Sequence, residues 1–310
     1  MIDLVSSILP IALLVGLGFV AVYTNALSSE LVKALGQFVL HFALPALVLS
    51  ALLRQDLRET LNWGYLIAYG GGSLLTFTAV FATMRFAMAR STGLSAVAAL
   101  GGSASNSGFV GFPVASLTLG APALTALPLC MVVENILIVP LALALAESAD
   151  AGNGRPLAAL RSTALRLARM PLILAIVAGV VLSALGVNLP LPVVTAVGMM
   201  ADAAIPCALI VVGGTLASLE VRSVAADVLP VALGKLILHP LLVGLSFFLV
   251  GGIPTELMAA GIIFAAAPMI TVYPILGARF GHERLAAAAL LATTLAGAAT
   301  MVAALAYALP

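Results

Sequence analysis

Five ionisable side chains stand inside long apolar stretches of this sequence, where a charged group needs a physical reason. They are His41, Glu134, Asp202, Lys235 and His239. At the centre of a membrane helix such a group costs roughly 2.5–3.5 kcal/mol on insertion scales. Carboxylate, imidazole and ammonium groups in apolar surroundings can exchange protons or attract an ion. Asp202, Glu134, Lys235 and His41 are therefore candidates for ion coupling or gating.

Asp202 and His41 take equivalent positions, each four residues before a proline, Pro206 or Pro45. Proline has no N–H, so in a helix it leaves the carbonyl oxygen four residues earlier without its usual partner. A proton or cation could use that oxygen together with the carboxylate of Asp202. A hydrogen bond from Asp202 to a neighbouring helix is the alternative. For His41 we expect an interior imidazole, with pH sensing as the alternative role.

Lys235 and His239 are spaced i,i+4, which places them on one face of a helix. A lysine there can attract an anionic substrate or replace a bound cation. The alternative is an ion pair with Asp202 or Glu134 that holds helices together. We interpret His239 as structural, and Glu134 as either a titrating carboxylate or a structural partner for a cation.

Two apolar segments contain helix-breaking residues. GGSASNSGFVGFP covers residues 101–113, and AAAPMITVYP covers residues 265–274. Their prolines free backbone carbonyl groups, and non-helical backbone at membrane depth is tolerated only where protein or water satisfies it. A matched pair of interruptions predicts a transport site. Two proline kinks packed against neighbouring helices are the alternative.

The composition shows which elements must position these residues. Of the 310 residues, 63% are apolar and 8% are charged, whereas soluble domains carry charge at about 25% of positions. This excludes a soluble domain and a disordered chain. A net charge of +1 without a basic cluster excludes a nucleic-acid binder, and continuous apolar runs exclude a membrane barrel. The sequence predicts an all-α polytopic membrane protein.

Stretches of about 20 apolar residues, the length that crosses the hydrocarbon layer, predict ten transmembrane helices. The expected spans are 4–24, 31–53, 62–84, 94–118, 121–146, 170–187, 193–218, 227–250, 256–279 and 285–308. The connection at 147–169 is the longest and most polar. It divides a first five-helix repeat, 1–146, from a second, 170–310.

The basic residues predict the orientation. Loops after the odd-numbered spans hold ten Lys and Arg residues, and the opposite side holds only Arg54 and Arg58. Basic loops stay in the cytoplasm, so the linker 147–169 is expected there and both termini on the extracytoplasmic side. We expect a multi-pass protein of the plasma membrane, the inner membrane of a bacterium.

The two halves repeat. Three pairs of helix breakers share one offset of 161 residues: Pro45 and Pro206, Pro113 and Pro274, Gly120 and Gly281. Because each repeat has an odd number of spans, the second enters the membrane from the opposite side. The sequence therefore predicts a 5+5 inverted repeat, typical of secondary transporters.

Three stretches carry a family resemblance: NSGFVGFPVASLTLGAPAL at 106–124, ENILIVP at 134–140 and AAAPMITVYPILGARFG at 265–281. They resemble the auxin efflux carrier family, which includes a bacterial malonate-transporter-like branch and the plant PIN carriers. The resemblance extends over essentially all ten spans. It implies a fold like that of bile-acid transporters and NhaA, with spans 4 and 9 broken and crossing. It also implies alternating-access transport of small organic anions by a homodimer.

The resemblance assigns site residues by position. Asn106 and Pro113 match the first crossover, Pro274 the second, and Asn135 an amide of the fifth span. Plant carriers have asparagine beside the second crossover proline, where this chain has Tyr273 and Ile275, so auxin is not the expected substrate. The candidate substrate contacts are Ser105, Asn106, Ser107, Pro113, Asn135, Thr271, Tyr273 and Pro274.

Several catalytic motifs do not occur in the sequence. There is no G-x-x-x-x-G-K-[ST], H-E-x-x-H, C-x-x-C or G-x-S-x-G motif, so we expect no cofactor, no metal and no enzymatic activity. The predicted function is secondary active transport of a small organic anion, a mono- or dicarboxylate such as malonate, coupled to protons or driven by voltage. Two alternatives stay open: a sodium-coupled symporter on the same fold, and a channel or sensor without turnover.

Overall fold

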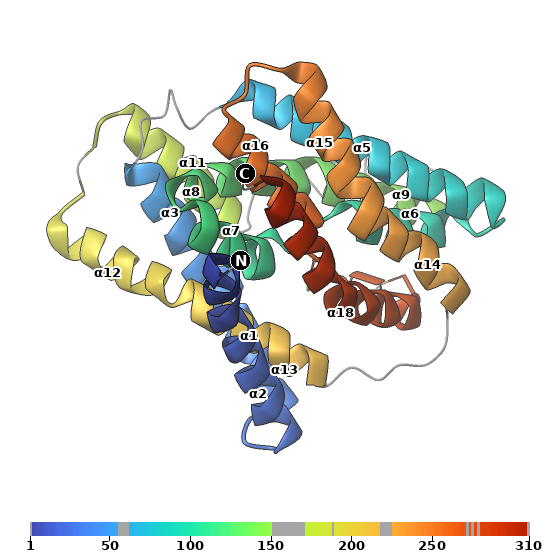
Figure 1. Cartoon of the computed structure of the whole chain (residues 1–310), viewed down its shortest axis with the longest axis horizontal. Coiled ribbons are helices and arrows are strands. Elements are labelled where there is room, and N and C mark those ends of the chain that lie inside the picture. The colour runs from blue at the N-terminus through green and yellow to red at the C-terminus, as the bar shows by residue number, and fades with distance from the viewer. Residues whose placement is uncertain are drawn as a thin grey trace. The chain divides into compact units, whose positions relative to one another are not determined.

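The structure is a computed structural model, and it describes residues 2–54, 62–150, 171–187, 189–217, 225–270, 273, 276–277 and 280–308. Throughout these ranges the regular structure is helical (Figure 1). The expectation of an all-α protein is confirmed.

The helices of the first half end at residue 150. Their bounds are α1 (Ile2–Tyr23), α2 (Ser29–Phe38), η1 (Val39–Ala43), α3 (Leu44–Arg54), α5 (Trp63–Ala82), η2 (Thr83–Ala87), α6 (Thr92–Ser103), η3 (Ser107–Gly111), α7 (Phe112–Leu119), α8 (Ala121–Val132), η4 (Val133–Ile138) and α9 (Val139–Asp150). The second half contributes α11 (Pro171–Ala184), α12 (Leu191–Asp202), α13 (Ala204–Ala217), α14 (Ala225–Leu233), η5 (Gly234–Leu238), α15 (His239–Val250), α16 (Thr255–Ala266) and α18 (Glu283–Ala308).

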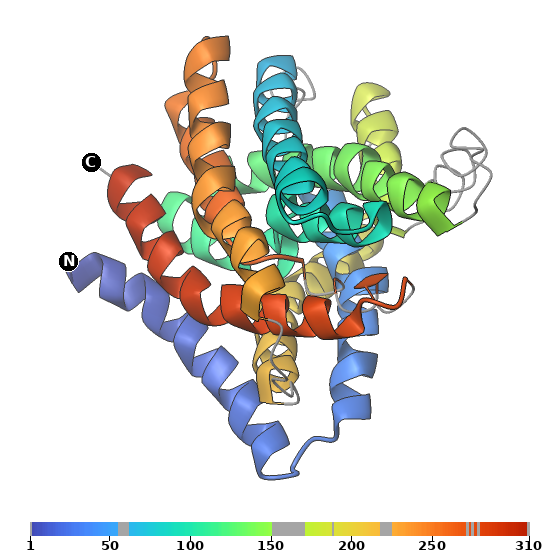
Figure 2. The same cartoon turned by 90° about the vertical axis from the view of Figure 1, so that its right-hand side faces the viewer.

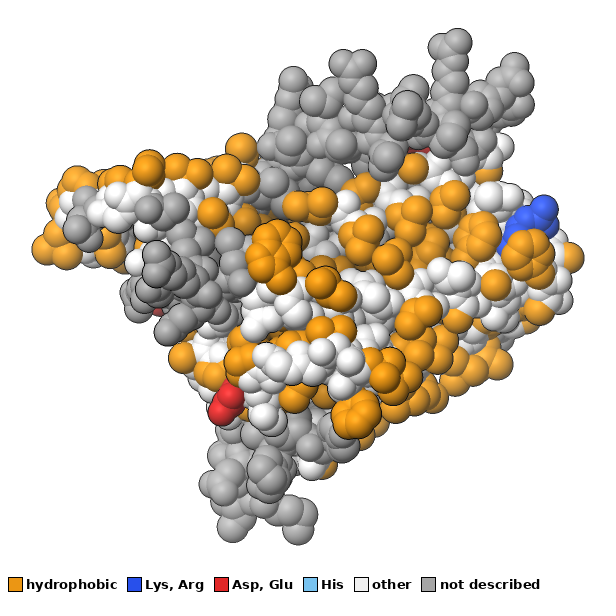
Figure 3. All heavy atoms as spheres, turned by 90° about the horizontal axis from the view of Figure 1, so that it is seen from above, with side chains coloured by type: hydrophobic (Ala, Val, Ile, Leu, Met, Phe, Trp, Pro, Cys, Tyr) orange, Lys and Arg blue, Asp and Glu red, His pale blue; other side chains and the backbone are white. Residues whose placement is uncertain are grey.

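Several helices have the length and composition of membrane spans. Six qualify in the described ranges: Ser29–Ser50, Trp63–Ala87, Ala121–Glu147, Leu191–Thr215, Ala226–Val250 and Arg284–Ala306. Shorter apolar helices stand at the places of the other four expected spans: Leu13–Tyr23, Ser107–Leu119, Leu174–Ser183 and Thr255–Ala266. Hydrophobic side chains are widespread on the described part of the face shown in Figure 3. The chain is a multi-pass membrane protein.

Prolines shape the helices in a regular way. The elements η1 to η5 are π-helical turns, and a proline follows four of them at the second residue after the turn: Pro45, Pro113, Pro140 and Pro240. Since proline cannot donate to the carbonyl four residues back, the backbone widens there. In η4, for example, the Val139 N–H reaches the Glu134 carbonyl five residues back. Turns of this kind are frequent at functional sites.

The chain forms two compact units, each built from both halves of the sequence. The first comprises Met1–Asn62, Gly108–Leu129 and Ala168–Ser218, and the second Trp63–Ser107, Cys130–Leu167 and Leu219–Pro310.

In the first unit, α1 and α13 lie side by side at glycine contacts (Figures 1 and 2). A Cβ at Gly18 would overlap the Ile210 carbonyl oxygen, and one at Gly213 would overlap that of Val15. Only glycine permits this approach of the two backbones. Close packing of this kind stabilises helix pairs in lipid, where the hydrophobic effect contributes little to helix association. In the same unit, α11 packs on α3.

The second unit repeats its packing pairs. The helix α5 packs on α6, and α15 packs on α16 in the same way. Likewise α6 packs on α9, and α16 packs on α18. The pairs formed by α5, α6 and α9 lie in the first half of the sequence, and the corresponding pairs formed by α15, α16 and α18 lie in the second half. This unit contains residues 101–107 of the first interruption and the described residues of the second.

We predict that Gly18→Ala destabilises the protein, because the added methyl group would overlap the Ile210 carbonyl oxygen. Overpacking of this kind costs about 1–3 kcal/mol, and thermal unfolding in detergent measures it. Gly16→Ala is the matched control, because a Cβ at Gly16 meets nothing within 4 Å. Equal unfolding temperatures for the two variants would contradict the close packing of α1 on α13.

Candidate functional site

The interruptions after α6 and α16 are bonded to each other. The backbone N–H of Asn106 donates to the carbonyl oxygen of Pro268 at 2.7 Å. Ser105 and Met269 form an isolated antiparallel bridge. Both stretches are buried, so each supplies partners for backbone groups that would otherwise lack them inside the membrane.

Glu134 stands at the first interruption, and its side chain is only 3% exposed. One carboxylate oxygen, Oε1, accepts bonds from four donors. These are the Ser107 hydroxyl at 2.7 Å, the Ser105 backbone N–H at 3.1 Å, the Tyr69 hydroxyl at 3.2 Å and the Cys130 thiol at 3.4 Å. A set made only of donors suits a carboxylate anion.

Lys235 stands at the second interruption and is fully buried. Its Nζ donates to the carbonyl oxygen of Ala265 at 2.5 Å and lies 3.0 Å from Nδ1 of His239. Ala265 belongs to the last turn of α16, where backbone carbonyl groups lack helical partners. Lys235 therefore caps the end of the broken helix.

His239, also fully buried, connects the lysine to two further elements. Its Nε2 lies 2.9 Å from the Ser73 hydroxyl of α5, and its Nδ1 lies 3.5 Å from the Ser105 hydroxyl. If charged Lys235 donates to Nδ1, then Nε2 carries the ring proton and donates to Ser73. The polar cluster thus comprises Tyr69, Ser73, Ser105, Ser107, Cys130, Glu134, Lys235 and His239, all in the second unit.

The two ionisable side chains, Glu134 and Lys235, match the helix ends that they contact. The carboxylate of Glu134 meets the start of the helical turn that begins at Ser107, and the ammonium of Lys235 meets the end of α16. Helix N-termini carry partial positive charge and C-termini partial negative charge. Each side chain therefore stabilises the end where it lies.

The expected ion pairs of Lys235 differ from the observed contacts. Among the described residues the ion pair within 4.0 Å is Arg90 with Asp227, at 2.9 Å. Asp202 is exposed and belongs to the first unit. Glu134 and Lys235 share the cluster, but each is satisfied by neutral groups rather than by the other.

Three predicted residues lie apart from the cluster contacts. The Asn135 side-chain amide donates to the Met131 carbonyl oxygen of its own helix at 2.9 Å. The expectation of an interior imidazole at His41 is wrong: His41 is exposed and lies 2.8 Å from the Gln37 carbonyl oxygen. Pro113 is buried in α7, after the turn η3. Thr271 and Pro274 lie outside the described residues.

Tyr273 is buried against α6. Its hydroxyl donates to the Val97 carbonyl oxygen at 3.0 Å. A Cβ at Gly101 would stand 2.7 Å from the tyrosine ring, so glycine is needed for this packing. The geometry gives Tyr273 a role in joining the second interruption to α6, and its contact with substrate stays a prediction.

Sequence reasoning missed three members of the cluster, Tyr69, Ser73 and Cys130. Tyr69 and Ser73 are spaced i,i+4 in an expected span, and Cys130 precedes Glu134 by four residues. A search for polar residues one helical turn from each buried charge would have found Cys130. It would not have found the α5 pair, because α5 meets the cluster through tertiary packing.

Residues 3–305 match the family described as "Membrane transport protein". The chain belongs to this family, the auxin efflux carriers. The resemblance read from the sequence motifs is confirmed. A protein of Rhizobium meliloti (strain 1021) named "Putative malonate transporter" is 28% identical over 303 residues, which cover 97% of this chain and 94% of the relative.

We predict that Lys235→Met destabilises this transporter. Methionine fills similar space but leaves the buried Ala265 carbonyl without its donor, at a cost of about 1–3 kcal/mol. Thermal unfolding measures the loss against Lys33→Met, which removes an exposed lysine. If both variants unfold at the same temperature, Lys235 does not stabilise the end of α16.

Proposed function

We propose that this membrane transporter is a secondary carrier of a small organic anion, a mono- or dicarboxylate such as malonate, and that it works by alternating access. The observation that supports this most strongly is the bonded pair of interruptions with one buried carboxylate and one buried ammonium beside it. Transport sites are commonly built from such broken helices. The name of the R. meliloti relative favours malonate.

We place the substrate at the interruptions. Ser105, Asn106 and Ser107 offer hydroxyl and amide donors there, with Asn135, Thr271 and Tyr273 as further contacts and Pro113 and Pro274 as the residues that break the helices. Carboxylates bind to hydroxyls, amides and backbone N–H groups near helix N-termini. The second unit is then the body that carries the substrate.

Charge balance favours proton coupling. The cluster holds one carboxylate and one ammonium, so their formal charges cancel. An anionic substrate adds negative charge to a buried, low-dielectric site, where an uncompensated charge is costly. A proton on Glu134 would offset one negative charge of the substrate, and Asp202 and His41 stay candidates for gating elsewhere. The membrane potential, worth about 2.3 kcal/mol per charge per 100 mV, is the other driving force.

We further propose that the chain has ten spans in a 5+5 inverted repeat, with spans 4 and 9 crossing. The six long helices and the four short apolar helices occupy ten expected places, and the packing pairs of the second unit recur between the halves. On this proposal residues 147–169 are cytoplasmic, both termini are extracytoplasmic, and the protein forms a homodimer in the bacterial inner membrane.

Transport by purified protein in proteoliposomes tests the function. We expect saturable uptake of labelled malonate, counterflow, stimulation by a proton gradient and no effect of replacing sodium with potassium. Glu134→Gln should slow uptake about tenfold or more, because it removes a charged acceptor of several hydrogen bonds. Glu256→Gln, at an exposed site in α16, is the control.

The same assay separates the rival functions. Flux that never saturates and shows no counterflow would identify a channel. Uptake that requires sodium and ignores pH would identify a sodium symporter and contradict proton coupling.

A binding measurement tests the site independently of turnover. Malonate at about one hundred times its Kd should stabilise the protein by about 2.7 kcal/mol, and tenfold weaker binding would lower this to about 1.4 kcal/mol. We expect Asn106→Ala to produce that reduction in a thermal-shift assay. Gln37→Ala, which removes an exposed amide, should leave the shift unchanged. An unchanged shift for Asn106→Ala would move the site elsewhere.

A further inference from the structure

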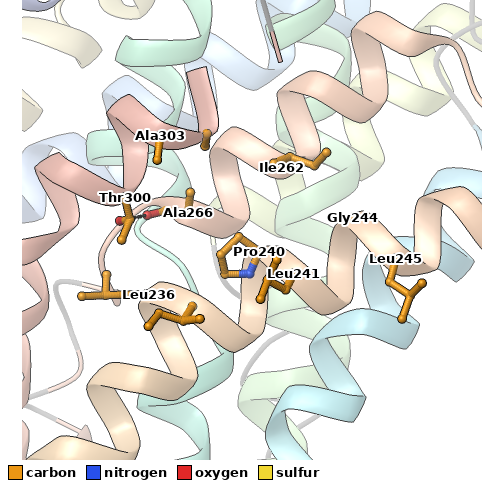
Figure 4. Close-up of a pocket in the computed structure, with 11 residues that line it drawn as sticks. Leu236, Pro240, Leu241, Gly244, Leu245, Ile262, Ala266, Thr300 and Ala303 are labelled. Atoms are coloured by element: carbon orange, nitrogen blue, oxygen red, sulfur yellow. Dashed lines mark hydrogen bonds between the residues drawn. The ribbon is translucent and has the colours of Figure 1, made fainter. Parts of the chain in front are cut away.

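A cavity lies in the unit that holds the polar cluster. It has a volume of about 540 Å³ and is bounded by η5 and α15 on one side and by α16 and α18 on the others (Figure 4). Its lining includes Pro240, Leu241, Leu245, Ile262, Ala266 and Thr300. This cavity is separate from the hydrogen bonds of Glu134 and Lys235.

The lining suits hydrocarbon rather than a polar ligand. Thr300 is the polar side chain among the described lining residues, and its hydroxyl lies 3.1 Å from the Ala266 carbonyl oxygen and 2.9 Å from that of Gly297. That hydroxyl is already used within the protein, as the dashed contact in Figure 4 shows for Ala266. A polar occupant would lose its bonds to water without replacing them.

The cavity is a groove that opens on a face that meets lipid. Ile237, Leu241 and Leu245 are 51%, 64% and 49% exposed, and they belong to the membrane-length helix Ala226–Val250. In a multi-pass membrane protein, exposed leucine and isoleucine in the middle of a span contact acyl chains. The groove is thus continuous with the lipid-facing surface of the protein.

The membrane supplies hydrocarbon chains at this surface. The groove runs between η5 and α15 on one side and α16 and α18 on the others. An extended acyl chain is narrow enough to enter it.

We propose that this groove holds one acyl chain of a bilayer glycerophospholipid, and that the chain supports the second interruption from the lipid side. Two lining residues, Ala266 and Pro240, directly follow Ala265 and His239, the two partners of Lys235. The acyl chain therefore packs behind the backbone that carries both partners. This proposal rests on the membrane location and does not depend on the identity of the substrate.

Native mass spectrometry of the protein in mild detergent tests the occupant. We expect one retained phospholipid per chain, and we expect added dioleoylphosphatidylglycerol to raise the unfolding temperature of delipidated protein. Ala303→Phe, which fills the groove from α18, should abolish both effects. Val302→Phe places the same ring at the adjacent exposed position, which does not line the groove, and should abolish neither.

A second variant covers the case in which Ala303→Phe does not fold. Leu241→Ala removes a side chain that is mostly exposed, so folding should survive, while retention of the phospholipid should weaken. Equal retention by the wild type, Ala303→Phe and Leu241→Ala would overturn the proposal. Retention of a free fatty acid in place of phospholipid would overturn it as well. So would a mass spectrum that shows two copies of the chain bound to each other and no bound lipid.

Discussion

The structure depends on one constraint: inside hydrocarbon, every backbone donor and acceptor needs a partner from the protein itself. Unbroken helices satisfy this internally, but α6 and α16 each end at buried residues inside the protein. The two interruptions supply some of the missing partners to each other, through Asn106 and Pro268. Glu134 and Lys235 supply others. Glu134 accepts from the Ser105 N–H before the turn that begins at Ser107, and Lys235 donates to a carbonyl group in the last turn of α16. These two helix ends carry partial charges of opposite sign. The buried charges are therefore consequences of broken helices as well as candidates for function.

Proline explains where the chain departs from the α-helix. Each of four prolines follows a π-helical turn, and those turns hold His41, Ser107, Glu134 and Lys235. The wider turn shifts the side chains around the helix axis relative to the next turn. The loss of one backbone hydrogen bond at each proline thus sets where the side chains of these turns lie, in helices that are otherwise regular.

The sequence predicted long apolar helices, both interruptions and the burial of Glu134, Lys235 and His239, because each depends on local composition or on the chemistry of proline. It did not predict which groups meet. An ion pair of Lys235 with a carboxylate was one of the alternatives, but Lys235 contacts His239 and a carbonyl group, because α16 ends beside η5. His41 was expected inside and is exposed. Such differences arise from tertiary packing, which residue spacing along one helix does not determine.

The chemistry of the cluster also constrains any cargo. Ser107 donates to Glu134 at 2.7 Å, so its hydroxyl can serve a substrate carboxylate only if Glu134 gives up that bond. A protonated Glu134 needs fewer donors, which would release Ser107 and the Ser105 N–H toward the substrate. If Lys235 keeps its bond to the end of α16, its charge would offset one negative charge of the substrate. Proton uptake and anion binding would then use the same donors, so that each favours the other by thermodynamic linkage.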